Sequence, residues 1–445
     1  MRTILFDSKP LRFHNLPVRF HNLPVLKLPA TAMNTLKVKI SLSVNNLIFA
    51  ILLNSVGVVI LQMINVAGVQ PEQASVLEAF KDLPIAVASF LLASFIPRFG
   101  YRRAMLIGLA VVSGAACVMA AGGGFGHAKV LFFLTGISFA LIKISGYSTI
   151  GLITRSAGEH ASFMSIMEGF FMVGVLSGFW LFGWFIDLEA SGAGVEWTAV
   201  YWVLAGLGAL AFLLLLTTPI DETGAVNEDS SPGQDFLDMM ALMRLPLVIF
   251  FAIGIFTYVY VEQALNTWLP SFNNRVLLIP DAMSVQLGSV YAGSLALGRI
   301  VGGWIMKRID WYYVLQACLL TAGILVLAVL PLAGAAEPGA VQSWGDVPLA
   351  AWLFPAIGLF LAPMYPTLSS TVLSALPANR QSGMTGLLVI FSALGGTTGS
   401  IITGFVFGRL DGQVAFYLTL VPLALIMLTL VPYRSRHRMR TQALT

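Results

Sequence analysis

Residues 198–218 read TAVYWVLAGLGALAFLLLLTT and contain no charged side chain. An α-helix rises about 1.5 Å per residue, so a run of this length spans about 30 Å, the hydrocarbon thickness of a bilayer. Backbone polar groups cannot face lipid unpaired, and the run lacks the strict alternation of a barrel strand. The stretch therefore predicts a transmembrane α-helix.

The rest of the chain repeats this pattern. Only 10% of the 445 residues are charged, against about 25% in a soluble domain, and 57% are apolar or aromatic. This composition excludes an ordinary soluble enzyme. We expect an all-α membrane protein with twelve transmembrane helices at 43–66, 74–97, 103–121, 130–153, 160–186, 198–218, 247–270, 283–306, 312–334, 349–375, 382–407 and 413–433. Pro355, Pro363 and Pro366 predict breaks in the tenth.

The positions of the basic residues predict the orientation. An even number of spans places both termini on one side, and Lys and Arg favour the cytoplasmic side. The loops of the opposite side contain only Lys129, Arg275 and Arg409. We therefore expect both termini in the cytoplasm and the chain in a bacterial inner membrane. The predicted cytoplasmic side carries Arg2, Lys9, Arg12, Arg19, Lys27, Lys37, Lys39, Arg98, Arg102, Arg103, Arg155, Arg244, Lys307, Arg308, Arg380, Arg434, Arg436, Arg438 and Arg440.

The charged and polar stretches divide the chain into two halves. The tail 1–42 contains the tandem heptapeptide RFHNLPV at 12–18 and 19–25, whose prolines oppose a helix, so we expect it to be disordered, with translation starting at Met33. Helical bundles follow at 43–218 and 246–433. An acidic cytoplasmic linker at 219–245 joins them, and a basic cytoplasmic tail covers 434–445.

Few cofactors or partners are expected. The only two cysteines, Cys117 and Cys318, lie in apolar runs, which gives no disulfide frame and no CxxC metal site. No phosphate loop, nucleophile elbow or HExxH run occurs. We expect no enzyme activity, no cofactor, no metal and no nucleic-acid partner, and a monomer in the lipid bilayer.

A basic turn recurs after the second run of each half. The first copy is PRFGYRR at 97–103, and the second is KRID at 307–310, about 210 residues later. Two parallel six-helix repeats with such turns resemble the major facilitator superfamily of secondary transporters, which implies that fold and alternating access. Its loop reads approximately GxxxDRxGRR, which Arg98, Gly100 and Arg102 match in the first copy and Gly303 and Arg308 in the second. Both copies lack the acidic residue, which puts the charge lock built on it in doubt.

A narrower resemblance lies in the tenth and eleventh runs. The segments PMYPTLSS at 363–370, QSGM at 381–384 and ALGG at 393–396 are similar to the fucose:galactose:proton symporter family. The resemblance implies a monosaccharide substrate. The family's acids in the first and fourth spans are missing: the first run has no carboxylate, and Lys143 begins the run KISGYS where an acid is expected. The family's own route of proton coupling therefore does not carry over.

Seven charged residues fall inside the predicted spans. A charge near the bilayer centre costs about 2.5–3.5 kcal/mol even on the lenient insertion scale, so each should face a partner or water. Counting from the span ends places Lys143, Glu168 and Arg299 near the cytoplasmic edge. Glu168 is expected to pair with Lys143 or, as an inner gate, with Arg299. Asp82 is expected to form an internal cluster with Glu78 and Lys81, with coupling or gating as the alternative.

Glu262 has no basic neighbour in its own span and is placed in the outer part of the membrane. We expect it to be the coupling acid or a hydroxyl acceptor for the substrate. The alternative is a buried carboxylate held by hydrogen bonds between spans. Sugar binding needs amides, carboxylates and an aromatic plane, and Trp268 is either that plane or an interfacial anchor. The substrate-site candidates are Asn54, Tyr147, Glu262, Gln263, Asn266, Trp268 and Tyr365.

These features predict a secondary active transporter for a small polar solute, with a monosaccharide expected and protons or sodium as the coupling ion. A proton-driven exporter of drug-like or other small organic compounds is the first alternative. A receptor built on the same fold is the second, and it would require a long soluble output domain.

Overall fold

The computed structural model describes residues 30–93, 95–154, 157–222, 239–334, 337, 339–376 and 378–444. Within these ranges the regular structure is entirely helical. The expected all-α class is therefore confirmed. The candidate disordered tail at 1–29, and residues 223–238 of the expected linker, lie outside the described residues.

The first bundle ends with α9. Its helices are α1 (Ala30–Asn54), α2 (Val56–Asn65), α3 (Pro71–Ala74), α4 (Val76–Ala93), α5 (Ile96–Phe99), α6 (Tyr101–Gly122), α7 (Phe125–Ile153), α8 (Ala157–Ala190), η1 (Trp197–Ala199) and α9 (Val200–Leu216).

The second bundle begins with α11. Its helices are α11 (Pro246–Arg275), α12 (Asp281–Gln286), α13 (Gly288–Ile305), α14 (Trp311–Ala333), η2 (Trp344–Asp346), α15 (Leu349–Leu353), η3 (Phe354–Ala356), α16 (Ile357–Leu361), α17 (Met364–Ser374), α18 (Ala378–Arg409), α19 (Gly412–Tyr417) and α20 (Leu420–Leu444). The break predicted in the tenth span is confirmed, because Pro355 lies in η3 and Pro363 separates α16 from α17.

Ten helical stretches in the described part of the chain are long and apolar enough to cross a membrane. The other two expected spans correspond to α4 and to α12 with α13. Helix α4 contains three charged residues, Glu78, Lys81 and Asp82, while α13 contains Arg299 and five glycines. Both therefore fall below the apolar character of the other ten. The charged residues in α4, and Arg299 with the glycines in α13, account for the difference.

Two helix ends differ from the expected boundaries. Helix α1 begins at Ala30, so the last part of the expected tail is helical, and α20 continues to Leu444 through the expected basic tail. The extension of α20 has partners: Arg434 and Arg438 lie 3.3 and 3.6 Å from Asp310 at the turn before α14. Ion pairs thus hold the extended helix, and the partnership with Asp310, more than 120 residues away, could not be predicted from the sequence.

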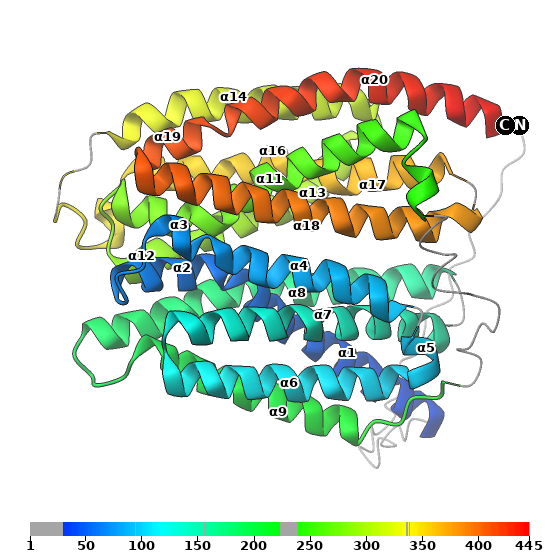
Figure 1. Ribbon diagram of the computed structural model, residues 1–445, viewed down its shortest axis with the longest axis horizontal. Helices are drawn as coiled ribbons and strands as arrows, with labels where there is room; N and C mark the ends of the chain where they lie inside the picture. Colours follow the sequence, from blue (N-terminus) through cyan, green and yellow to red (C-terminus); the bar gives the residue numbers. More distant parts are fainter. Residues whose placement is uncertain are drawn as a thin grey trace, which may run out of the picture.

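The two bundles lie side by side, with the first in blue to green and the second in green to red (Figure 1). Helix α1 begins and α20 ends at the same end of the molecule, which we call the terminal end. The short helices α2, α3 and α12 gather at the opposite end, which we call the distal end (Figure 1). The long helices run between these two ends.

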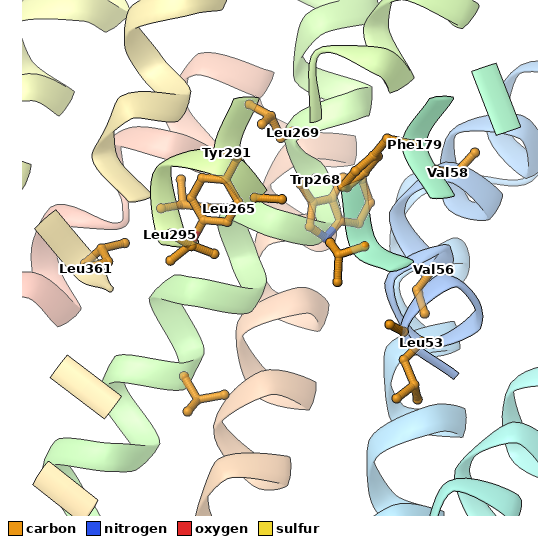
Figure 2. Close-up of a cluster of buried hydrophobic side chains, with 14 of the residues drawn as sticks. Leu53, Val56, Val58, Phe179, Leu265, Trp268, Leu269, Tyr291, Leu295 and Leu361 are labelled. Carbon is orange, nitrogen blue, oxygen red and sulfur yellow. The ribbon is translucent and has the colours of Figure 1, made fainter. Parts of the chain in front are cut away.

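The main apolar core crosses the boundary between the bundles. Leu53, Val56 and Phe179 of the first bundle and Trp268 and Leu269 of the second belong to one cluster of buried side chains (Figure 2). Close backbone contact accompanies it, because a side chain on Gly57 of α2 would collide with the Thr267 carbonyl of α11. The bundles are therefore packed directly against each other in this region.

Candidate functional site

Glu262 and Arg299 meet within the second bundle. The Arg299 Nη2 lies 3.9 Å from the Glu262 Oε1, and the side chains are 40% and 16% exposed. The expectation that Glu262 has no cation in its own span holds, but α13 supplies one. Counting from each helix end assigned the two residues to opposite halves of the membrane, and the contact shows that their side chains reach each other across that difference. Glu262 lies 16 residues from the start of α11, and Arg299 only six from the end of α13.

Glu168 binds a tyrosine instead of a cation. The Tyr147 hydroxyl of α7 donates to the Glu168 Oε1 of α8 at 2.7 Å. The Lys143 Nζ lies over the rings of Phe139 and Tyr147, 5.4 and 5.8 Å from their centroids. Lys143 and Glu168 interact electrostatically, but no direct ion pair joins them. In place of the expected ion pair between Lys143 and Glu168, the Glu168 carboxylate binds the Tyr147 hydroxyl, and Lys143 lies over the Tyr147 ring.

The expected inner gate between Glu168 and Arg299 is not formed in the described structure. Arg299 approaches Glu262, and its Nη1 donates to the Met172 Sδ of α8 at 3.9 Å. The guanidinium therefore still links the two bundles, through a thioether instead of a carboxylate. The positions of Glu168 and Glu262 along their helices do not show which of the two is the partner of Arg299.

Tyr365 of α17 connects the two acids. Its hydroxyl interacts electrostatically with Glu168, Glu262 and Arg299, and its ring lies 6.3 Å from that of Tyr258. Five of the predicted residues, contributed by both bundles, thus gather in one region. We call this the central site and define it as Tyr147, Glu168, Glu262, Arg299 and Tyr365, with Lys143 beside it.

Two of the predicted amides point at the boundary between the bundles. The Asn266 Nδ2 lies 3.5 Å from the Asn54 Oδ1, and the Asn54 Nδ2 donates to the Ala50 carbonyl at 2.9 Å. Asn54 ends α1 where Ser55 interrupts the helix. Because the contact between Asn266 and Asn54 is long for a hydrogen bond, the two amides are able to exchange it for hydrogen bonds to other groups.

Trp268 has no surface to offer a solute in this structure. The side chain is fully buried, and its indole Nε1 donates to the Ser400 carbonyl at 3.1 Å. Its ring packs on Phe407 at 5.3 Å. Neither expected role, sugar-stacking plane or interfacial anchor, fits this position. Helix-end aromatics look alike in sequence, and only the fold shows that α18 covers this one.

The α4 cluster forms as expected and has additional partners on α11. Glu78 is fully buried, and its carboxylate accepts hydrogen bonds from Lys81 at 2.5 Å, Gln263 at 2.7 Å and Thr267 at 2.9 Å. Asp82 lies 3.5 Å from the Lys81 Nζ and against Gly396 of α18. Gln263 therefore belongs to an interface between the bundles instead of the central site. The α11 partners were missed, because a sequence does not show which helices touch.

Further polar contacts close the distal end. The Asn65 Nδ2 donates to the Asn274 Oδ1 at 2.9 Å and approaches Asp281 at 3.1 Å, while Gln62 also reaches Asp281 at 3.2 Å. Glu72 pairs with Arg409 at 3.1 Å. Each contact joins the first bundle to the second. The distal end is therefore sealed by polar contacts above the apolar core.

The basic turns stay within their own bundles. Arg102 donates to the carbonyls of Leu215 and Leu216 at the end of α9, and its backbone N–H donates to Glu222 at 2.7 Å. Gly100 adopts a φ of 102°, and a Cβ there would lie 2.9 Å from the Glu222 carboxylate. An acid from the linker thus fills the place of the missing loop acid. Of the other motif residues, Arg98 is exposed, Arg308 stacks on Trp304 at 5.3 Å and Gly303 borders open space.

No candidate metal centre is found in the described part of the chain. A group of three or more His, Cys, Asp or Glu side chains that could hold an ion is absent from these residues. The chemistry available at the central site is therefore that of carboxylates, phenols and two cations. Such groups can bind hydroxyls and charges through hydrogen bonds and ion pairs.

Comparison with known proteins agrees with this arrangement. Residues 42–395 match the family model described as Major Facilitator Superfamily. A glucose/galactose transporter of Brucella abortus is 26% identical over 355 residues, covering 76% of this chain and 80% of that protein. Among solved structures, the nucleoside transporter NupG has a TM-score of 0.66 at 17% identity, covering 91% of this chain and 98% of that one.

A bacterial homologue of the human lysosomal transporter Spinster, in an inward-facing and occupied conformation, has a TM-score of 0.65 at 14% identity. The alignment covers 93% of this chain and 97% of that one. At these identities the two structures establish the shared fold alone.

Proposed function

Because the chain belongs to the major facilitator superfamily, whose members are transporters, we propose that it moves a monosaccharide across the membrane by alternating access, coupled to an ion. The observation that carries the proposal is the central site, where carboxylates and phenols from both bundles gather inside a membrane protein. The relatedness to the glucose/galactose transporter of Brucella abortus supports a sugar as the solute.

The central site offers what a polyol needs. A sugar hydroxyl donates to a carboxylate and accepts from a phenol, and buried charge-assisted hydrogen bonds contribute about 1.5–3 kcal/mol each. Glu168 already accepts from Tyr147, so a hydroxyl could join both groups without leaving either unpaired. Tyr365 presents a ring nearby for the apolar face of the sugar. In this proposal Asn54 and Asn266 provide further partners on the distal side.

Alternating access follows from where the bundles touch. Contacts through Asn65, Asp281 and the α4 cluster close the distal end. For a solute to enter from that side these contacts must separate, and the bundles must close instead at the terminal end. With both termini in the cytoplasm, as the basic loops predict, the structure represents a state closed to the outside.

Glu262 is proposed as the coupling acid. At 3.9 Å from Arg299 its carboxylate is near a cation without being locked to it. Small movements of α13 relative to α11 would change whether Arg299 or a proton neutralises Glu262. A carboxylate that exchanges a cation for a proton as the bundles move is what coupling requires.

The test is uptake of labelled glucose and galactose by purified protein in liposomes, with and without an inward proton gradient. We expect saturable uptake, stimulated at least tenfold by the gradient, and loss of that stimulation in Glu262→Gln with counterflow exchange retained. Glu337→Gln, which changes an exposed acid between α14 and α15, is the matched control.

Gradient-driven uptake that is unchanged in Glu262→Gln would remove the coupling role. Absence of any sugar uptake would overturn the proposed substrate class. Efflux of amphipathic drugs under the same gradient would favour the exporter instead.

A further inference from the structure

Two cations, Arg299 and Lys143, lie in or beside the central site together with its two acids, and a neutral sugar does not require them. Lys143 has an exposed side chain, and its ammonium group lies over the rings of Phe139 and Tyr147. A cation in hydrocarbon would be costly, so a lysine inside a membrane helix is expected to face a partner or water.

Neither cation is held by a short hydrogen bond to a carboxylate. Among the described side chains, none of the ion pairs within 4 Å involves Lys143, which lies over the rings of Phe139 and Tyr147 and is only within electrostatic range of Glu168. Arg299 stands 3.9 Å from Glu262, well beyond the roughly 2.7–2.9 Å of a charge-assisted hydrogen bond. Its other Nη reaches only the Met172 thioether. The forked guanidinium therefore has unused donors.

The acids are less available than the cations. Glu262 is 16% exposed, whereas Arg299 is 40% exposed. Glu168 is exposed but already accepts the Tyr147 hydroxyl. The exposed charged groups of the site are thus the two cations and Glu168, which is already hydrogen-bonded, while Glu262 beside Arg299 is mostly covered.

We propose that the preferred solute is an acidic sugar, a hexuronate or aldonate, whose carboxylate binds Arg299 while its hydroxyls bind Glu168 and Tyr147. Lys143 supplies the second positive charge that attracts the anion into the site. The guanidinium fork matches a carboxylate in two parallel hydrogen bonds, which a neutral hydroxymethyl group cannot form. The inference rests on the proposed function and narrows its substrate class.

Galactose and galacturonate form a matched pair of probes, because they differ only in the group at C6. Binding to purified protein, measured calorimetrically or by thermal shift, needs no gradient and so does not depend on coupling. We expect galacturonate to bind at least tenfold more tightly than galactose, which corresponds to about 1.4 kcal/mol. We expect Arg299→Gln to abolish this preference while changing galactose affinity less than threefold.

Two further variants guard against misfolding. Arg299→Lys keeps the charge but loses the fork, and we expect it to retain part of the preference, whereas Lys143→Gln should weaken galacturonate alone, and more strongly at low salt. Arg308→Gln, in a turn outside the site, is the control and should bind like the parent.

The outcomes separate the two hypotheses. If galactose is bound and transported and galacturonate neither binds nor competes, the acidic-sugar inference falls while the proposed function stands. If Arg299→Gln and Lys143→Gln both keep the tenfold preference, the assigned residues are wrong and the inference fails. If neither sugar binds, both fall.

Discussion

At the scale of single residues, charge inside the membrane was visible in the sequence, but its partners were not. Glu262, Arg299, Glu168 and Lys143 were identified because ionisable groups rarely occur in apolar spans. The structure pairs Glu262 with Arg299 and Glu168 with Tyr147. Pairing depends on helix neighbours and side-chain reach, which a linear count of depth does not contain.

The Tyr147 hydroxyl gives a test at this scale. Tyr147→Phe removes the donor to Glu168 but leaves the ring under Lys143. Losing one hydrogen bond to a charged group costs about 1.5–3 kcal/mol, or about tenfold to 150-fold in affinity. We expect sugar affinity to fall by this factor, measured as the half-saturation of counterflow, with folding unchanged.

The control for Tyr147→Phe is Tyr417→Phe, in the short helix α19. It should leave half-saturation within twofold of the parent. An equal loss of affinity in both variants, or no loss in Tyr147→Phe, would contradict the place of Tyr147 in the site.

At the scale of elements, the breaks in the helices lie where the bundles meet or bend. Ser55 separates α1 from α2, Leu287 separates α12 from α13, and Pro363 separates α16 from α17. The break between α16 and α17 could be predicted from the prolines in the sequence. The other two lack proline at the break itself, so tertiary packing, not local propensity, determines them.

Gly57 provides a test of how α2 contacts α11. A methyl group there would collide with the Thr267 carbonyl, so Gly57→Ala should push the bundles apart at the distal end. Such overpacking costs about 1–3 kcal/mol. With cysteines introduced at Asn65 and Asn274 and the native Cys117 and Cys318 replaced by serine, we expect the disulfide yield to fall at least fivefold.

Gly206→Ala is the matched control for Gly57→Ala, because a Cβ at Gly206 of α9 meets no atom within 4 Å. Its cross-linking yield should equal that of the parent. Should Gly57→Ala cross-link as efficiently as Gly206→Ala, the α2–α11 contact does not control closure.

At the scale of the whole molecule, two bundles of matching design enclose the central site. Each basic turn is anchored within its own bundle, the first by the end of α9 and Glu222 and the second by Arg434 and Arg438. The polar contacts that join the bundles lie instead at the distal end, around the α4 cluster, between Asn54 and Asn266, and between Arg299 and Met172. Each bundle can therefore move as a unit while its own turn stays intact.

Orientation in the membrane gives the test at this scale. The basic loops predict that both termini lie in the cytoplasm. In intact cells we expect a membrane-impermeant maleimide to label cysteines placed at Ala193 and Gln342, between the long helices at the distal end. A cysteine at Ser435 in α20 should react only after permeabilisation. The reverse pattern would invert the proposed direction of closure.

Much of the fold was predictable because only helices or closed barrels satisfy the backbone hydrogen bonds of a chain that crosses lipid. Each of the twelve expected spans corresponds to one helix or to a series of consecutive helices, such as α15, η3, α16 and α17 in the tenth, with ends shifted by a few residues in most cases. The larger differences, at α1 and α20, arise where polar residues extend a helix beyond the apolar run. Of the candidate site, residue types were predictable, whereas Trp268 and Gln263 were misplaced because their environments belong to other helices.

The sequence by itself determined that this protein is a helical membrane protein in two related halves, since apolar length, charge and repeat spacing are properties of the linear chain. Only the tertiary structure decided which charges meet, which aromatic rings are covered and which end is closed. Those features depend on contacts between residues one hundred or two hundred positions apart, such as Glu78 with Thr267 and Asn65 with Asn274. Hydrophobicity determines that a segment lies in the membrane, but helix packing determines which residues are its neighbours.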